Sequence, residues 1–201
     1  MHHRIGVLGG TFDPIHSAHI AAADTAVQLF NLDQVYFVPA GIAYHRDSSI
    51  ASPQQRLDMT RLALDGDSRF EVSSVDVERP GNTYTLETLH DLKRRFVENF
   101  PHDTAEWFLI LGADAFEAFG SWRDPLGILS ECQLVVISRP GGTTANYPDF
   151  PAHRVDIPGW EISSTEIRSR IARGESVQGL LPQAVMDYIR ENDLYTSNKR
   201  N

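Results

Sequence analysis

Cysteine is nearly absent from the 201 residues of this sequence, and Cys132 is the only one. One thiol cannot form a disulfide within the chain, and it cannot provide the several thiolates of a structural zinc site. Cys132 stands at the start of an apolar run. We therefore expect a buried cysteine that binds no metal, and no disulfide framework.

Long apolar runs and an excess of positive charge are also missing. No apolar stretch approaches the roughly 20 residues that a membrane-spanning helix needs. The formal net charge is −9, which argues against a broad surface for nucleic acids or anionic membranes. We therefore expect a cytoplasmic protein that binds neither, and any anionic substrate must meet a local cluster of donors.

Three common catalytic and nucleotide-binding patterns do not occur in the sequence. A Walker A lysine loop and a GxGxxG fingerprint are both missing, so P-loop hydrolysis and ordinary dinucleotide redox chemistry fit poorly. The HExxH pattern of zinc peptidases is missing too. The composition, with 41% hydrophobic and 22% charged residues, is that of an ordinary globular protein. A chain of this length is expected to form a single domain, 1–201.

The most informative stretch is residues 4–19, which read RIGVLGGTFDPIHSAH. A short apolar run predicts a buried strand, and Gly9 and Gly10 then allow a turn and a close approach to a ligand. A helical pattern begins near His16, so His16 and His19 share one face of its first turn. Free N–H groups and the helix dipole favour an anion there. We interpret the stretch as a phosphate site rather than a joint with two ordinary surface histidines.

The rest of the chain alternates between strand and helix patterns. The strands are predicted at 34–38, 70–77, 107–111, 134–138 and 154–157. The later helices are predicted from 53 to near 66, from 83 to 96, from 162 to 173 and from 182 onward. Such alternation predicts a doubly wound, Rossmann-like α/β fold, with a parallel sheet, helices on both faces and a small C-terminal helical extension. In such sheets ligands bind beyond the carboxyl ends of the strands.

The loop 140–151, rich in proline and glycine, is the best candidate for an internal boundary. We expect a Rossmann-like core over 1–139, followed at 152–196 by a strand and helices that complete the phosphate site. Ser163, Ser164 and Thr165 begin a helix in this second part, with Arg168 one turn later. Hydroxyls and an arginine at a helix start suit an anion, although simple capping by Ser163 explains the pattern equally well.

Together the two clusters resemble the signatures of the nucleotidyltransferase superfamily. Residues 10–19 (GTFDPIHSAH) resemble its GxFDPxHxGH element, and residues 162–168 (ISSTEIR) resemble its ISSTxxR element. The chain departs from the first element at Ala18, where the family usually has glycine. The added methyl group narrows the approach to a bound phosphate.

Within the superfamily, the chain resembles the nicotinate mononucleotide adenylyltransferases over nearly its whole length. The further segments that carry the resemblance are YTLETL at 84–89, LGAD at 111–114, SW at 121–122, SRPG at 138–141 and LP at 181–182. That family joins ATP and nicotinate mononucleotide to give deamido-NAD and pyrophosphate. Residues 43–46 read AYHR, where the family usually has a Pro-Pro-His-Lys-like run, so the prolines are missing while a basic residue remains.

The resemblance implies a role for each matching residue. The residues expected to bind ATP are Gly9, Gly10, Thr11, Phe12, Gly112, Asp114, Arg139, Ser163, Ser164 and Thr165. The catalytic residues expected at the phosphates are His16, His19 and Arg168. The residues expected to bind nicotinate mononucleotide are Thr85, Trp122, His45 and Arg46. The resemblance further implies Mg²⁺ carried by ATP without a dedicated protein site, although Asp13 could bind it directly. A homo-oligomer is compatible with the sequence.

Several alternatives stay open at this stage. The acceptor could be nicotinamide mononucleotide or phosphopantetheine instead of the nicotinate compound, and the protein could be a nucleotide-binding regulator without turnover. Paired histidines could also bind zinc. Trp122 could be a core residue, as we expect for Trp107 and Trp160, and the role of Tyr84 is undecided.

Overall fold

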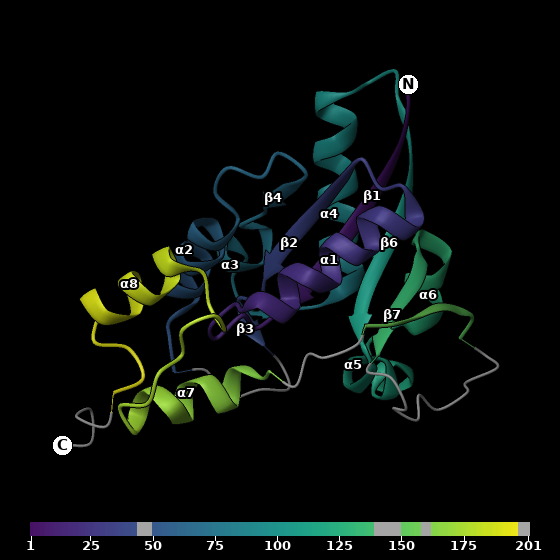
Figure 1. Cartoon of the computed structure of the whole chain (residues 1–201). Coiled ribbons are helices and arrows are strands. Elements are labelled where there is room, and N and C mark those ends of the chain that lie inside the picture. The colour runs from purple at the N-terminus through teal and green to yellow at the C-terminus, as the bar shows by residue number, and fades with distance from the viewer. Residues whose placement is uncertain (44–49, 139–149, 158–161, 197–201) are drawn as a thin grey trace.

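The computed structural model describes residues 1–43, 50–138, 150–157 and 162–196 (Figure 1). The strands are β1 (His2–Gly10), β2 (Gln34–Pro39), β3 (Ile42–Ala43), β4 (Phe70–Val72), β5 (Asn82–Thr83), β6 (Thr104–Gly112), β7 (Gln133–Ser138) and β8 (Ala152–Asp156). The helices are α1 (Ser17–Phe30), α2 (Pro53–Leu64), α3 (Val75–Glu78), α4 (Thr85–Asn99), α5 (Ala113–Glu117), α6 (Pro125–Glu131), α7 (Ser164–Ala172) and α8 (Gln183–Glu191), with a 3₁₀ turn η1 (Phe119–Ser121).

Among the described residues, six strands form one parallel sheet in the order β4-β2-β1-β6-β7-β8. The chain builds outward from β1 to β4, then crosses back to β6 and builds outward on the other side. This is the strand order of the doubly wound Rossmann fold. The prediction of an α/β fold with a parallel sheet is confirmed. The order reverses between β1 and β6, where Leu8 is paired with Ile110.

Helices cover both faces of the sheet because successive strand residues point in opposite directions. In β6, Phe108 and Ile110 belong to one hydrophobic core, which α1, α2, α7 and α8 complete. Leu109 and Leu111 belong to the other core, which α4, α5 and α6 complete. Cys132 is buried in this second core, as expected, and burial raises the pKa of its thiol to about 12.

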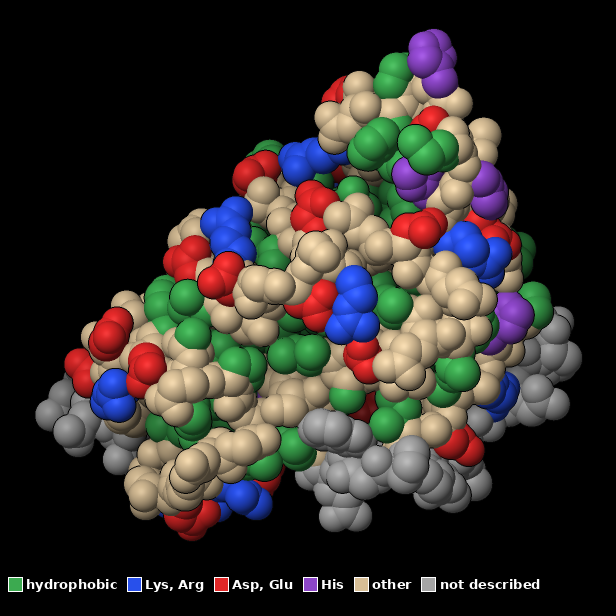
Figure 2. Space-filling model, turned by 45° about the horizontal axis from the view of Figure 1, so that its top comes forward, with side chains coloured by type: hydrophobic (Ala, Val, Ile, Leu, Met, Phe, Trp, Pro, Cys, Tyr) green, Lys and Arg blue, Asp and Glu red, His purple; other side chains and the backbone are tan. Residues whose placement is uncertain are grey.

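The surface carries charges of both signs. On the face shown in Figure 2, basic and acidic side chains are interspersed. In the part of the chain that the structure describes, none of the helices combines the length and the apolar character needed to cross a bilayer.

The strand predicted at 70–77 is wrong beyond its first three residues. β4 ends at Val72, and the chain turns into the short helix α3. The buried carboxylate of Asp76 explains the turn, because it accepts hydrogen bonds from Arg79 at 2.9 Å and from Thr88 at 2.7 Å. These partners lie toward α4, so tertiary contacts outweigh the strand propensity of the valines.

Three further elements, one helix and two short strands, were not predicted. The helix α6 begins with Asp124, whose side chain accepts from the Gly127 N–H, and with Pro125 in the first turn. This cap and proline are a sequence signal for a helix start. The two-residue strands β3 and β5 pair with each other outside the main sheet. Their partners lie 40 residues apart, and no local pattern indicates them.

Candidate functional site

The glycines at the ends of β1 and β6 lie at the switch point of the sheet. Gly10 ends β1 and Gly112 ends its neighbour β6, so the two predicted nucleotide-contacting turns share one edge. A Cβ on Gly10 would lie 2.7 Å from the Phe12 ring, and packing therefore requires glycine there. A Cβ on Gly9 would meet nothing within 4 Å. Asp114 is exposed in the first turn of α5, beside this edge.

His16 and His19 form a stacked pair at the start of α1. His16 is the N-cap residue, and its backbone N–H donates to Nδ1 of His19 at 3.2 Å. The two ring centroids are 3.7 Å apart, and the ring of Phe12 meets that of His19 at a right angle. Phe12 is buried, and its φ of +50° is a left-handed conformation that residues other than glycine rarely adopt. The packing around the rings thus fixes their positions.

Both imidazoles are neutral near pH 7. Burial lowers the pKa of His16 to about 4, and its side chain is only 4% exposed. Burial, and then the neighbouring His16, lower the pKa of His19 well below its ordinary value. Because Nδ1 of His19 accepts a hydrogen bond, the proton of the neutral ring lies on Nε2. That N–H is a donor available to a ligand.

The start of α7 packs directly on the segment between β1 and α1 (Figure 1). The hydroxyl of Ser164 donates to the Pro14 carbonyl at 3.0 Å. The guanidinium of Arg168 donates to the Asp13 carbonyl at 2.7 Å. The two helix starts, about 150 residues apart in sequence, are therefore in contact with each other.

The three hydroxyls at the start of α7 differ in what they can still offer. Ser163 caps the helix, accepting from the Glu166 N–H at 3.2 Å, and Thr165 accepts from Arg168 at 3.3 Å. Both are exposed and keep their own hydroxyl protons for a ligand. Ser164 gives its proton to Pro14. Its side chain therefore joins the two segments, while Ser163 and Thr165 can donate outward.

The carboxylate of Asp13 is fully engaged within the protein. Its side chain is 2% exposed, and it accepts from the backbone N–H groups of Ile50 at 2.8 Å and Ala51 at 3.2 Å. It also accepts from the Tyr195 hydroxyl at 2.7 Å. These contacts do not suit a direct metal ligand. Within the described ranges, no three His, Cys, Asp or Glu side chains are grouped to bind a metal ion.

Thr85 and Trp122 belong to neighbouring segments. Thr85 is the first residue of α4, and Trp122 follows η1, half-buried against Phe119 with ring centroids 5.4 Å apart. The guanidinium of Arg123 lies 4.5 Å from the ring centroid of Tyr84. This contact brings the start of α4 next to the segment of Trp122. The half-buried ring is compatible both with core packing and with stacking on a ligand.

Three predicted site residues, His45, Arg46 and Arg139, lie outside the described residues, as does Trp160. The predicted contacts of the 42–52 loop with the acceptor therefore stay predictions.

Sequence reasoning missed two buried residues that hold the site together. Arg56, in α2, donates to the carbonyls of Thr11 and Gly41, and Tyr195, near the end of the chain, donates to Asp13. An arginine in an otherwise polar stretch of helix is expected to be exposed to solvent, so the sequence gives no sign that Arg56 is buried. For Tyr195, the apolar pair that it forms with Leu194 is a weak signal of docking.

The chain is similar to known proteins over nearly its whole length. A family model described as cytidylyltransferase-like matches residues 7–170. A protein from Clavibacter michiganensis subsp. michiganensis, named probable nicotinate-nucleotide adenylyltransferase, is 39% identical over 196 residues, which is 96% of this chain and 94% of that protein. This chain belongs to the nicotinate-nucleotide adenylyltransferase family, among the cytidylyltransferase-like proteins.

Other members of the family match over the same length. Proteins of the same name from Leifsonia xyli subsp. xyli and Exiguobacterium sibiricum are 41% and 36% identical, over 96% of this chain and 94% and 100% of their own. A solved structure of Plasmodium falciparum nicotinic acid mononucleotide adenylyltransferase complexed with NaAD has a TM-score of 0.73 at 23% identity, covering 96% of this chain and 98% of that one. That likeness shows the shared fold.

Proposed function

We propose that this protein transfers the adenylyl group of ATP to nicotinate mononucleotide, giving deamido-NAD and pyrophosphate. The observation that carries the proposal is the contact between the two helix starts, through Ser164 with Pro14 and Arg168 with Asp13, beside the stacked histidines. Anion-binding groups from both parts of the chain then face one triphosphate. The names of the relatives support nicotinate mononucleotide as the acceptor.

The proposed step is an in-line displacement at phosphorus. An oxygen of the acceptor's 5′-phosphate forms a bond to the α-phosphorus of ATP. The bond from that phosphorus to the oxygen that bridges the α- and β-phosphates breaks, and this oxygen leaves with the pyrophosphate. The attacking oxygen is already anionic, so no strong general base is needed. The protein contributes alignment, and donors where negative charge accumulates.

On the ATP side, the donors are the neutral imidazoles of His16 and His19 and the charged guanidinium of Arg168. The hydroxyls of Ser163 and Thr165 and the N–H groups at the start of α7 would bind the leaving pyrophosphate. The turn residues expected along the nucleotide are Gly9, Gly10, Thr11 and Phe12. Gly112 would approach the adenosine, and Asp114 would accept from the ribose hydroxyls. Arg139 would lie beside the nucleotide.

On the acceptor side, backbone N–H groups at Thr85 would bind the nicotinate carboxylate, and Trp122 would stack on the ring. His45 and Arg46 would bind the mononucleotide from the 42–52 loop. The contact of Arg123 with Tyr84 supports the pairing, since it brings these two segments together.

We propose that Mg²⁺ enters with ATP. Mg²⁺ commonly binds through substrate phosphates with one or two carboxylates and keeps several waters. The buried carboxylate of Asp13 already accepts hydrogen bonds from N–H and O–H donors, so we do not propose it as a ligand of the ion.

A panel of acceptors tests the function. Purified protein is incubated with ATP and either nicotinate mononucleotide, nicotinamide mononucleotide or phosphopantetheine, while pyrophosphate release and product mass are measured. We expect the highest kcat/KM with nicotinate mononucleotide and a product with the mass of deamido-NAD. A preference for another acceptor would contradict the substrate. Tight ATP binding without pyrophosphate release would indicate a regulator instead.

A further inference from the structure

Arg56 is the most deeply buried charged residue of the described chain, with its side chain 1% exposed in the first half of α2. Its Nη1 donates to the Thr11 carbonyl at 2.6 Å, and its Nη2 donates to the Gly41 carbonyl at 3.0 Å. One guanidinium thus joins two segments that are 30 residues apart in sequence.

The two carbonyls lie just beyond the ends of neighbouring strands. The last backbone hydrogen bond between the strands β1 and β2 runs from the Ala40 N–H to the Gly10 carbonyl at 2.8 Å. Past this point the segments diverge, since Thr11 leads to the phosphate turn and α1, while Gly41 leads to β3. The guanidinium of Arg56 joins them where the backbone pairing of the sheet has ended.

Gly41 is also confined on a second side. A Cβ at this position would lie 2.1 Å from the Asp76 carbonyl, so the backbone packs directly against α3. The next residues form β3, which pairs with β5, and Ala43 is opposite Thr83. β5 leads into the start of α4, where Thr85 lies. The position of Gly41 is therefore linked to the proposed acceptor side of the site.

Stability alone does not explain a buried cation at this place. Within the described residues, Arg56 makes no ion pair, and its Nε makes no hydrogen bond. Burial lowers the pKa of Arg56, while Asp13 and Tyr195 oppose that shift, so the guanidinium stays charged. Burying a charge without a directly paired carboxylate costs free energy. A cost of this kind is often tolerated where the buried group specifies a geometry.

We propose that Arg56 is a positioning residue for adenylyl transfer, holding the ATP-side turn at Thr11 and the acceptor-side segment at Gly41 at a fixed spacing. The inference rests on the proposed function for its two ligands. Small misplacements of two reacting groups lower the rate strongly. Each half of the site still binds its own substrate when the link is lost. Loss of the Arg56 link is therefore expected to lower kcat more than it raises the KM of either substrate.

The test compares Arg56→Lys and Arg56→Met with a control, Thr60→Val. Lysine retains the charge but replaces two donor nitrogens with one, and methionine removes both. Thr60 is fully buried one turn later in α2, and its hydroxyl donates only to the Arg56 carbonyl, so the control perturbs the helix without touching either segment. The measurements are kcat, both KM values, urea unfolding, and amide hydrogen exchange at 10–13 and 40–43.

We expect kcat to fall about 10-fold in Arg56→Lys and about 100-fold in Arg56→Met, with each KM within about threefold of wild type. Exchange should rise in both segments of the Arg56 variants, and neither change should occur in Thr60→Val. The proposal is overturned if kcat is unchanged, if exchange is unchanged, or if Thr60→Val loses as much activity at equal stability. Should Arg56→Met fail to fold, Arg56→Lys decides.

The design separates this inference from the proposed function. If wild-type protein shows no turnover with any acceptor, the function is contradicted. The exchange measurement needs no turnover, so it still decides whether Arg56 holds the two segments together.

Discussion

Two residues at the start of α1, His16 and His19, are packed against each other and also provide hydrogen-bond donors for the proposed reaction. The rings of His16, which is buried, and His19, which is half-buried, are stacked, and they are hydrogen-bonded so that one ring N–H of His19 stays free. A neutral imidazole can donate to a phosphate without itself needing a counter-ion in the apo protein. The cost of burying a charge there is thus avoided until the nucleotide brings its own charge.

The first prediction concerns the histidine donors. We expect His16→Ala to lower kcat by roughly 10²–10³-fold, because it removes a donor placed where charge accumulates in the transition state. The matched control is His90→Ala, since His90 is half exposed on α4 and its ring pairs with Glu131, and the kcat of this variant should not change. The kcat values are measured from initial rates of pyrophosphate release. Normal turnover of a folded His16→Ala protein would remove His16 from the mechanism.

The second prediction concerns pH. The pKa of His16 is about 4 in the folded protein and 6.5 in a model peptide, so the unfolded chain binds more protons between these values. Unfolding free energy should therefore fall as the pH drops from about 6.5 to about 4, by roughly 3 kcal/mol from this residue. His19 acts in the same direction.

Urea unfolding at several pH values, in wild type and His16→Asn, measures that contribution. The variant should lose stability less steeply over the acidic range, and the two curves should run parallel above about pH 7. Curves with equal slopes throughout would show that His16 titrates normally in the folded protein.

At the scale of elements, the segment after α8 packs against the turn between β1 and α1. Tyr195 is buried and donates to the Asp13 carboxylate, which also accepts from the Ala51 N–H just before α2. The Asp13 carbonyl accepts from Arg168. Burial, and then the Asp13 carboxylate, raise the pKa of the Tyr195 hydroxyl, so it remains a donor. Three elements distant in sequence thus meet at one carboxylate.

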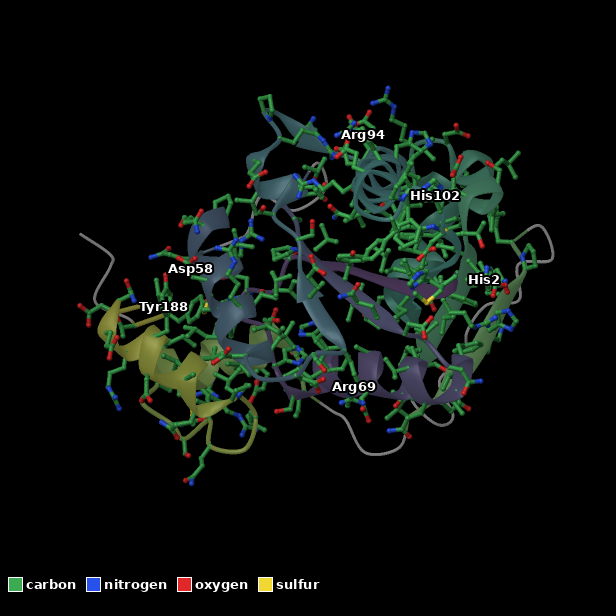
Figure 3. The ribbon with its side chains drawn as sticks, turned by 90° about the horizontal axis from the view of Figure 1, so that it is seen from above. His2, Asp58, Arg69, Arg94, His102 and Tyr188 are labelled. Atoms are coloured by element: carbon green, nitrogen blue, oxygen red, sulfur yellow. The ribbon has the colours of Figure 1, made fainter. Side chains whose placement is uncertain are left out.

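The third prediction follows from this contact. Tyr195→Phe should lower the unfolding free energy by about 1.5–3 kcal/mol, the range for a hydrogen bond to a charged group. The control is Tyr188→Phe, because Tyr188 of α8 meets Asp58 at 3.3 Å in a more exposed setting (Figure 3). It should cost less than about 0.5 kcal/mol. Equal losses in the two variants, measured by urea unfolding, would show that Asp13 does not depend on Tyr195.

At the scale of the whole molecule, the sequence was sufficient for the fold, and the two segments that it predicts at the phosphates lie in contact. Periodic apolar runs and glycines marked the strands, and Ser163 marked a helix cap that the structure confirms. Local patterns of this kind reflect backbone preferences, which act over a few residues. The helix α3 escaped prediction because its cause, the buried Asp76, has its partner Thr88 in another element.

The supporting residues of the site were out of reach for the same reason. Arg56 and Tyr195 look ordinary in sequence, and their importance comes from partners 45 and 182 residues away. Such contacts exist only once the sheet has brought the segments together. By contrast, His16 could be proposed from the sequence because neighbouring glycines and a helix start form a local pattern typical of an anion site.

The last prediction tests whether ATP binds across both parts of the chain. If the start of α7 and the β1–α1 turn hold one triphosphate, then ATP at about 100 times its Kd stabilises the wild type by about 2.7 kcal/mol. Arg168→Met should weaken binding at least 10-fold, which leaves less than about 1.4 kcal/mol at the same ATP concentration. Arg190→Met is the control, since Arg190 is exposed on α8 and contacts only Asp187 through its charge. Urea unfolding with and without ATP gives the values. An undiminished effect of ATP on Arg168→Met would mean that the nucleotide is held by the N-terminal part alone, because a ligand stabilises only through the groups that bind it.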